Sequence, residues 1–162
     1  MNQSLQNNNA EKKLVLLKKR ALYYLGKREY SRKELHEKIT PFSESLDLTR
    51  QQVNQILTEL ESKDWLSDRR FADQFVFSKK GKFSIKKMEY ELKMRGVNEI
   101  IIHNALNEIK SEEYNLAKNI WEKKFRKLPE NPEERLKQMR FLQSRGINSA
   151  LIHQILSGKL SE

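Results

Sequence analysis

Two stretches of this chain repeat the same residues fifty positions apart. The shared residues are Leu92 and Leu142, Arg95 and Arg145, Gly96 and Gly146, Asn98 and Asn148, Ile102 and Ile152, His103 and His153, and Leu106 and Leu156. Self-similarity at such a period is typical of repeat proteins, in which each unit is one supersecondary element that stacks on its neighbours. The chain is therefore predicted to contain a duplicated unit.

The residues inside each copy predict a helix, a tight turn and a second helix. Ile85, Met88 and Leu92 stand at i, i+3 and i+7, which places them on one apolar face of a helix. Glycine adopts the left-handed conformation more readily than other residues do, and a residue in that conformation often ends a helix, so Gly96 is expected to end this one. Asn98 is a good N-cap for the helix that follows. Gly146 and Asn148 have the same two roles in the second copy.

A third, earlier copy is also visible, so the repeat is threefold. Thr49, Val53 and Leu57 stand where the next unit has Asn98, Ile102 and Leu106, and Leu116, Ala117, Ile120 and Trp121 match Phe71, Ala72, Phe75 and Val76. We expect an all-α protein of three tandem three-helix repeats. Residues 1–10 are expected to be a disordered lead-in, followed by repeats over 11–66, 67–110 and 111–162.

Capping signals predict where several helices begin. Ser31 with Glu34, and Thr49 with Gln52, have the spacing of capping boxes. The helix that Ser31 opens is expected to end at Pro41, because proline disfavours a helical conformation in the residue before it. A loop is expected from residue 40 to residue 48.

The second repeat is rich in aromatic residues. Asp68 is expected to cap a helix that carries Phe71, Phe75 and Phe77, just after Trp65. Aromatic side chains at helical spacing usually bury large areas, so core positions are favoured over base-stacking positions.

The third repeat follows the pattern less closely. Asn131 and Pro132 form a strong helix start, with a cap and a proline at the first helical position. Gln138, however, falls where Met88 predicts an apolar residue. The packing of this repeat is therefore expected to differ in detail.

The charge of the chain favours a polyanionic partner. Lysine and arginine number 32 against 22 acidic residues, so the net charge is +10. Nucleic acid is the commonest polyanion that basic proteins bind. Cysteine is absent, which excludes disulfides and thiolate metal sites. The apolar run at 14–17 is too short for a signal peptide or a membrane span, so we expect a cytoplasmic chain without a membrane partner.

Two windows concentrate the positive charge. Residues 79–95 hold seven cations and two acids, and residues 11–33 hold nine cations and two acids. From the first window the candidate contacts for phosphate are Lys79, Lys80, Lys82, Lys86, Lys87, Lys93 and Arg95, and from the second they are Arg28, Arg32 and Lys33. A cationic groove that follows phosphates is one interpretation, and a solvated helix face is the other.

Enzymatic signals are weak. The three histidines, His36, His103 and His153, fall in different predicted helices, and the common hydrolase, metalloprotease and phosphate-loop motifs are absent. Paired acids such as Glu133 and Glu134 stand at a helix start, where the helix dipole explains them. We therefore expect a binding protein that has no catalytic residues, metal or cofactor.

Three motifs in order give the chain a resemblance to the RecX family. The first is Ala21, Leu22, Leu25, Arg28, Ser31, Glu34 and Leu35; the second is Trp65, Leu66, Asp68, Phe71 and Ala72; the third is Lys80, Gly81, Leu92, Gly96 and Val97. The resemblance covers residues 21–157. Lysines replace the arginines that relatives often carry after Gly81.

The resemblance implies an elongated, curved array of three-helix repeats that modulates the RecA recombinase. On that basis the basic face would contact the RecA–DNA filament and inhibit the recombinase and ATPase activities of RecA, in the setting of DNA repair, DNA recombination and the SOS response. We expect the chain to be a monomer. The alternative function is sequence-specific DNA binding without RecA, with one unit acting as a helix-turn-helix.

Overall fold

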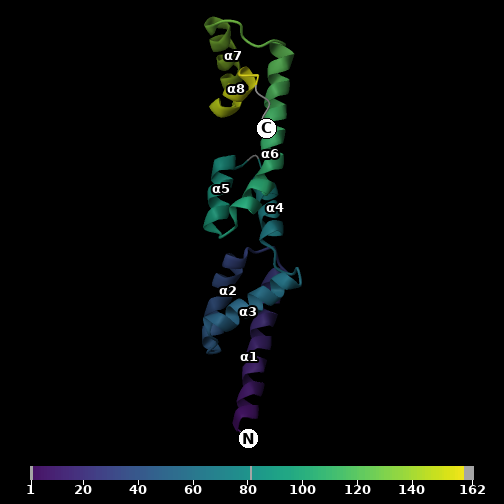
Figure 1. Ribbon diagram of the computed structural model, residues 1–162, viewed down its shortest axis with the longest axis vertical. Helices are drawn as coiled ribbons and strands as arrows, with labels where there is room; N and C mark the ends of the chain where they lie inside the picture. Colours follow the sequence, from purple (N-terminus) through teal and green to yellow (C-terminus); the bar gives the residue numbers. More distant parts are fainter. Residues whose placement is uncertain (1, 81, 159–162) are drawn as a thin grey trace. The chain divides into compact units, whose positions relative to one another are not determined.

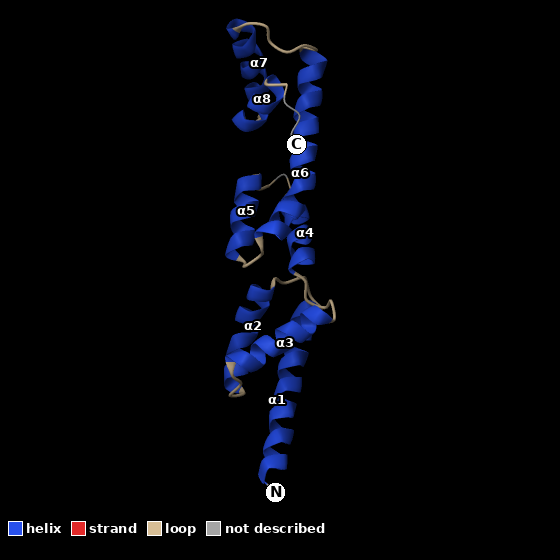
Figure 2. Ribbon diagram, in the orientation of Figure 1, coloured by secondary structure: helices blue, strands red, loops and turns tan. Residues whose placement is uncertain are grey.

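The computed structural model describes residues 2–80 and 82–158, and their regular structure is helical (Figures 1 and 2). The helices of this described part are α1 (Asn2–Leu25), α2 (Arg32–Ser45), α3 (Arg50–Ser62), α4 (Asp68–Lys79), α5 (Ile85–Met94), α6 (Glu99–Lys124), α7 (Pro132–Ser144) and α8 (Ser149–Leu156). The prediction of an all-α fold is confirmed.

Helices α1, α2 and α3 pack on one another and form the first repeat. Their core contains Leu17 from α1, Leu35 and Ile39 from α2, and Leu57 and Leu60 from α3, all fully buried. The three helices thus meet through residues at helical spacing, as an amphipathic pattern requires. Thr49 and Gln52 form the predicted capping box at the start of α3.

Two boundaries in this repeat differ from expectation. Helix α1 begins at Asn2, and so includes most of the stretch that the sequence predicted to be disordered. Helix α2 passes through Pro41 and ends only at Ser45. A proline removes one backbone donor from a helix, and the hydroxyl of Thr40, beside it, donates to the carbonyl of His36 at 2.6 Å. The loop expected over residues 40–48 is therefore wrong for residues 40–45, which belong to α2.

The second repeat consists of α4, α5 and the first part of α6. The N-cap of α4 is Ser67, whose hydroxyl accepts from the amide of Arg70, and not Asp68 as predicted. The carboxylate of Asp68 instead accepts the backbone amide of Arg32 at 2.7 Å. Because Ser67 already caps the first turn of α4, the carboxylate of Asp68 is free to accept a hydrogen bond from the first repeat.

The aromatic residues of this repeat divide into two groups. Phe71 and Phe75 are buried, as predicted. Phe77 is 82% exposed and Trp65 is 46% exposed, so the prediction of a core position is wrong for both. Two cations, Lys18 and Lys63, lie within 5.9 and 5.1 Å of the Trp65 ring centroid.

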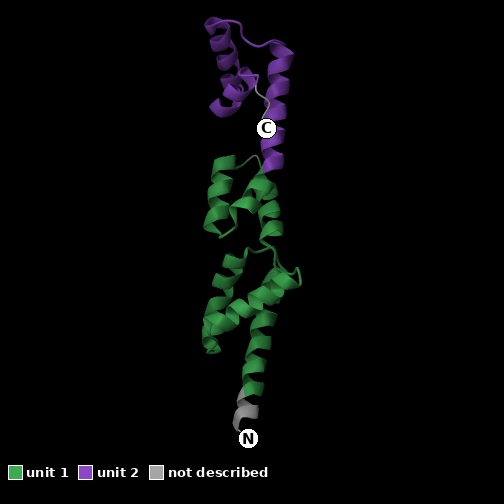
Figure 3. Cartoon of the chain, in the orientation of Figure 1, with its two compact units in different colours: residues 1–106 green, residues 107–162 purple. Residues whose placement is uncertain are grey.

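Helix α6 serves two repeats. Three three-helix repeats would need nine helices, but the described residues contain eight, because residues 99–124 form one continuous helix. No glycine or proline interrupts this stretch. The chain divides into two compact units within α6, residues 1–106 and residues 107–162 (Figure 3).

The third repeat combines the end of α6 with α7 and α8. Its core includes Trp121, Leu142 and Ile152, each at most 7% exposed. Asn131 and Pro132 begin α7 as predicted. Gln138 is buried among these apolar residues: it accepts the indole N–H of Trp121 at 2.7 Å and donates to the carbonyl of Lys127 at 3.2 Å. The polar residue at this position therefore has a partner for each end of its amide.

Both repeat glycines adopt the left-handed conformation that the sequence predicts. Gly96 has φ +75° and Gly146 has φ +77°. Their surroundings differ: a Cβ at Gly96 would lie 2.9 Å from the Cβ of Lys33, whereas a Cβ at Gly146 would meet no atom of the structure within 4 Å. Position 96 therefore requires glycine for two reasons: its left-handed backbone conformation and the lack of space for a Cβ beside Lys33.

We expect alanine to be less well tolerated at the first glycine than at the second. Gly146→Ala should lower the free energy of unfolding by about 1 kcal/mol, the strain of a left-handed alanine. Gly96→Ala should lower it further, because Lys33 must also move. Urea unfolding followed by circular dichroism measures both. Equal losses for the two variants would contradict the close approach of Lys33.

Candidate nucleic-acid interface

The basic window at 79–95 spans the end of one helix, a turn and a second helix. Lys79 is in the last turn of α4, and Lys80 is its C-cap. Because α5 begins only at Ile85, Lys82 precedes that helix. Lys86, Lys87 and Lys93 lie on α5, and its C-cap is Arg95. The cations of this window therefore come from two helices and the turn between them. Gly81 lies outside the described residues.

The start of α2 packs against the end of α5. The hydroxyl of Ser31 donates to the carbonyl of Arg95 at 2.7 Å and accepts the amide of Glu34 at 3.1 Å. Lys33 donates from Nζ to the carbonyl of Met94 at 2.9 Å. Carbonyl groups at a helix end lack partners within the helix. The first repeat therefore supplies donors to the second, a joint that the sequence did not predict.

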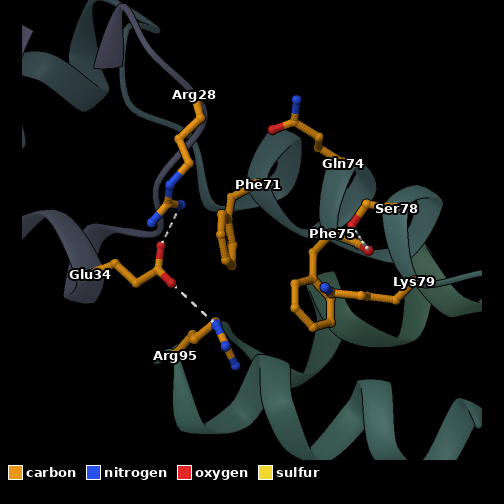
Figure 4. A pocket seen from close by; sticks show the side chains of 8 residues that line it. All are labelled: Arg28, Glu34, Phe71, Gln74, Phe75, Ser78, Lys79 and Arg95. Carbon is orange, nitrogen blue, oxygen red and sulfur yellow. Dashed lines mark hydrogen bonds and ion pairs between the residues drawn. The ribbon is translucent and has the colours of Figure 1, made fainter. Parts of the chain in front are cut away.

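A single carboxylate joins the two predicted groups of cations. Glu34 accepts from Arg28 at 3.0 Å and from Nε of Arg95 at 3.2 Å (Figure 4). Its side chain is therefore not the second half of the capping box that the sequence predicted; only the Ser31 half is formed. Arg95 also pairs with Glu91, and this hydrogen bond lowers the pKa of the Glu91 carboxyl group.

These groups line a pocket of about 420 Å³, which we call the junction pocket (Figure 4). Its lining residues are Arg28, Glu34, Phe71, Gln74, Phe75, Ser78, Lys79 and Arg95. The guanidinium carbon of Arg95 lies 5.1 Å from the centroid of the Phe75 ring, and Nζ of Lys79 lies 6.0 Å from it. The structure thus brings Arg28, from one window, beside Lys79 and Arg95, from the other.

Three other predicted cations have partners elsewhere. Arg32 pairs with Glu61. Both Arg32 and Lys33 line a different pocket, of about 410 Å³. Lys93 lies 3.2 Å from Glu89 and 3.4 Å from Glu99, and hydrogen bonds to these two carboxylates raise its pKa. Arg32 and Lys93 are thus neutralised by internal acids, as Arg28 and Arg95 are, and a phosphate would have to compete with these ion pairs.

The turn and the start of α5 provide cations that form no ion pair, although, besides the hydrogen bond from Arg95, the charge of Lys87 helps to lower the pKa of the Glu91 carboxyl group. Lys82, Lys86 and Lys87 are exposed and form no ion pair in the part of the chain that the structure describes. Nζ of Lys87 lies 3.9 Å from the centroid of the Phe83 ring, and Nζ of Lys79 lies 5.2 Å from it. These lysines can meet an external anion without losing an internal carboxylate.

The described residues offer no metal site. They contain no group of three or more histidine, aspartate or glutamate side chains placed to hold a metal ion. His153 instead lies 3.4 Å from a guanidinium nitrogen of Arg135, and His36 lies 3.5 Å from the hydroxyl of Thr40. Among the described helices, none is both long and apolar enough to span a membrane.

Two family models match consecutive parts of the chain. The model of the second three-helix domain of RecX matches residues 67–106, and the model of its third three-helix domain matches residues 111–156. A regulatory protein RecX from Chromobacterium violaceum is 39% identical over 142 residues, which are 88% of this chain and 90% of that protein. This chain belongs to the RecX family.

Further relatives agree with this assignment. A regulatory protein RecX from Ralstonia pickettii is 36% identical over 88% of this chain and 87% of its own length. The crystal structure of RecX from Lactobacillus salivarius shares the fold, with a TM-score of 0.58 at 19% identity over 91% of this chain and 96% of that one. A regulatory role and three-helix repeats therefore follow from the RecX family.

Proposed function

We propose that this RecX-family chain binds filaments of RecA on DNA and inhibits their recombinase and ATPase activities. The family assignment supports a regulatory role. The observation that carries the rest of the proposal is the set of exposed lysines at 82, 86 and 87, which form no ion pair in the described residues. Three such cations within six positions suit a polyanionic fibre.

The proposed contact is with phosphate and not with base edges. Lysine is a flexible point charge that neutralises phosphates without reading sequence. Each phosphate neutralised releases counterions, so affinity should fall steeply as the salt concentration rises. We propose that inhibition comes from occupying the filament and requires no catalysis by this chain. The target is a cytoplasmic filament, so we place the protein in the cytoplasm.

Co-sedimentation with RecA tests the proposal. The wild-type chain is centrifuged with RecA in the presence and absence of single-stranded DNA and of a nonhydrolysable ATP analogue. We expect it to pellet strongly only when RecA, DNA and nucleotide are all present. Failure to pellet with the assembled filament would contradict filament binding. Sedimentation-velocity ultracentrifugation of the free protein checks the expectation that it is a monomer.

A binding series on bare DNA separates this function from sequence-specific recognition. Several unrelated duplexes of one length are titrated at increasing salt. We expect similar affinities for all of them and a strong common dependence on salt. Preference for one duplex by about a thousandfold, the usual scale of specific binding, would favour a helix-turn-helix function without RecA.

A further inference from the structure

We propose that the junction pocket binds one phosphodiester group of the DNA backbone. This inference rests on the proposed function and names a site for part of it. The pocket lies beside the lysines of the turn, since Lys79 lines the pocket and shares the Phe83 ring with Lys87. A strand that meets these lysines would therefore pass close to the pocket.

The charges of the pocket favour an anion. Arg28, Lys79 and Arg95 line it, against Glu34 as its one acidic lining residue. Each guanidinium also keeps unused donors. Arg28 uses NH1 for Glu34 and for the carbonyl of Glu29, and Arg95 uses Nε and NH1 for Glu34 and Glu91. A guanidinium has five N–H groups in a plane, and the NH2 group of both arginines makes no hydrogen bond within the described chain.

Glu34 shows that the pocket already holds one set of anionic oxygens. Its two carboxylate oxygens bind different arginines, at 3.0 and 3.2 Å. Two guanidinium groups thus converge on one anionic group through a single hydrogen bond each, and arginine can donate to phosphate oxygens in the same way. The side chain of Arg28 is 49% exposed, so an anion from solution can reach it. The internal carboxylate therefore competes with an external phosphate for the two arginines.

The aromatic side of the pocket favours a nucleic-acid backbone as the source of the phosphate. Phe71 and Phe75 form part of its lining (Figure 4). An apolar wall beside the cations lowers the local dielectric and strengthens their attraction for an anion. It also provides a surface for the deoxyribose next to the phosphate. Inorganic phosphate lacks that second contact and should bind more weakly.

The first test adds a negative charge at the pocket without disturbing its ion pairs. Gln74 lines the pocket, is exposed, and makes no hydrogen bond within the described chain. Gln55→Glu is the matched control, because Gln55 is exposed on α3 and does not line the pocket. Fluorescence anisotropy measures the affinity for a labelled oligothymidylate without RecA. We expect Gln74→Glu to weaken binding by about fivefold, and Gln55→Glu by less than about twofold.

The second test removes the internal competitor. Glu34→Gln should strengthen oligothymidylate binding by about fivefold, because both arginines lose their carboxylate but stay in place. Glu44→Gln makes the same charge change at an exposed residue of α2 that forms no ion pair in the described chain, and should alter affinity by less than about twofold. Circular dichroism confirms folding of each variant. If Glu34→Gln does not fold, the Gln74→Glu comparison decides alone.

Equal effects of Gln74→Glu and Gln55→Glu would overturn the pocket as a phosphate site. A separate titration compares sodium phosphate with sodium chloride at one ionic strength. We expect phosphate to compete only slightly better than chloride, because it meets the cations but lacks the sugar contact, whereas displacement of the oligothymidylate by millimolar phosphate alone would overturn the preference for DNA. Co-sedimentation with RecA fails or succeeds independently of these results, so loss of the pocket and loss of the proposed function are distinguishable.

Discussion

Replacing Lys82, Lys86 and Lys87 together by glutamate is expected to abolish inhibition of the RecA ATPase and of strand exchange. The three ammonium groups are exposed and form no ion pair within the described chain, so their loss leaves no buried acid unpaired. The substitution turns three attractive contacts with phosphate into three repulsive ones. We expect the concentration needed for half-inhibition to rise by about a hundredfold or more.

The fold should tolerate this change. Residues 86 and 87 lie in the first turn of α5, where acidic side chains interact favourably with the helix dipole. The N-cap contact from Ser84 goes to the backbone amide of Lys87 and does not involve its side chain. The far-ultraviolet circular dichroism of the variant should therefore match that of the wild type.

A second triple variant separates position from net charge. Lys12, Lys19 and Lys110 are exposed, and none has an ion pair in the described part of the chain. Their replacement by glutamate changes the net charge equally, and we expect only a few-fold weaker inhibition. Full inhibition by the 82, 86, 87 variant, or equal loss in both variants, would contradict the assignment of this surface.

The second large effect is expected in the core of the third repeat. Gln138→Met restores the residue type found at the equivalent Met88, yet it should destabilise the protein by about 1–3 kcal/mol. The indole N–H of Trp121 would lose its only acceptor among the described residues, in a position that is 7% exposed. Leaving a buried donor unsatisfied costs more than an average hydrogen bond contributes.

A double-mutant cycle identifies the cause. Trp121→Phe removes the donor, and in that background Gln138→Met should be much less harmful, because only the bond to the Lys127 carbonyl is then lost. Urea unfolding followed by circular dichroism gives the four free energies. Additive losses, with no coupling between the two positions, would show that the hydrogen bond does not stabilise this core.

Local chemistry made much of the fold predictable from the sequence. The glycine positions, the Thr49 cap and the Asn131–Pro132 start depend on neighbours within a few residues, and the structure confirms each of them. Pro41 misled the prediction because a proline weakens a helix without always ending it, when packing on both sides holds the helix together. The buried Leu35 and Ile39 precede it, and Ser43 is buried after it.

The candidate site was less accessible to sequence reasoning. The two basic windows were visible as composition, but the partner of each cation was not. Arg95 is 61 residues from Glu34 in the chain, and no local pattern indicates that pair. The sequence therefore gave exposed Lys86 and paired Lys93 equal weight. Ser31 could be predicted as a helix cap, but nothing in the sequence indicated that it is fully buried and donates to the carbonyl of Arg95.

The contacts between the start of α2 and the end of α5 make the stability of each of the first two repeats depend on the other. Ser31, Lys33 and Glu34 bind groups at the end of α5, and Asp68 binds the amide of Arg32 in return. A fragment that stops at residue 66 would expose these donors and acceptors to water and lose the shared enthalpy. Residues 1–106 are therefore expected to unfold in one cooperative transition. The unit that repeats in the sequence is a single three-helix repeat, whereas the unit that is stable contains two of them.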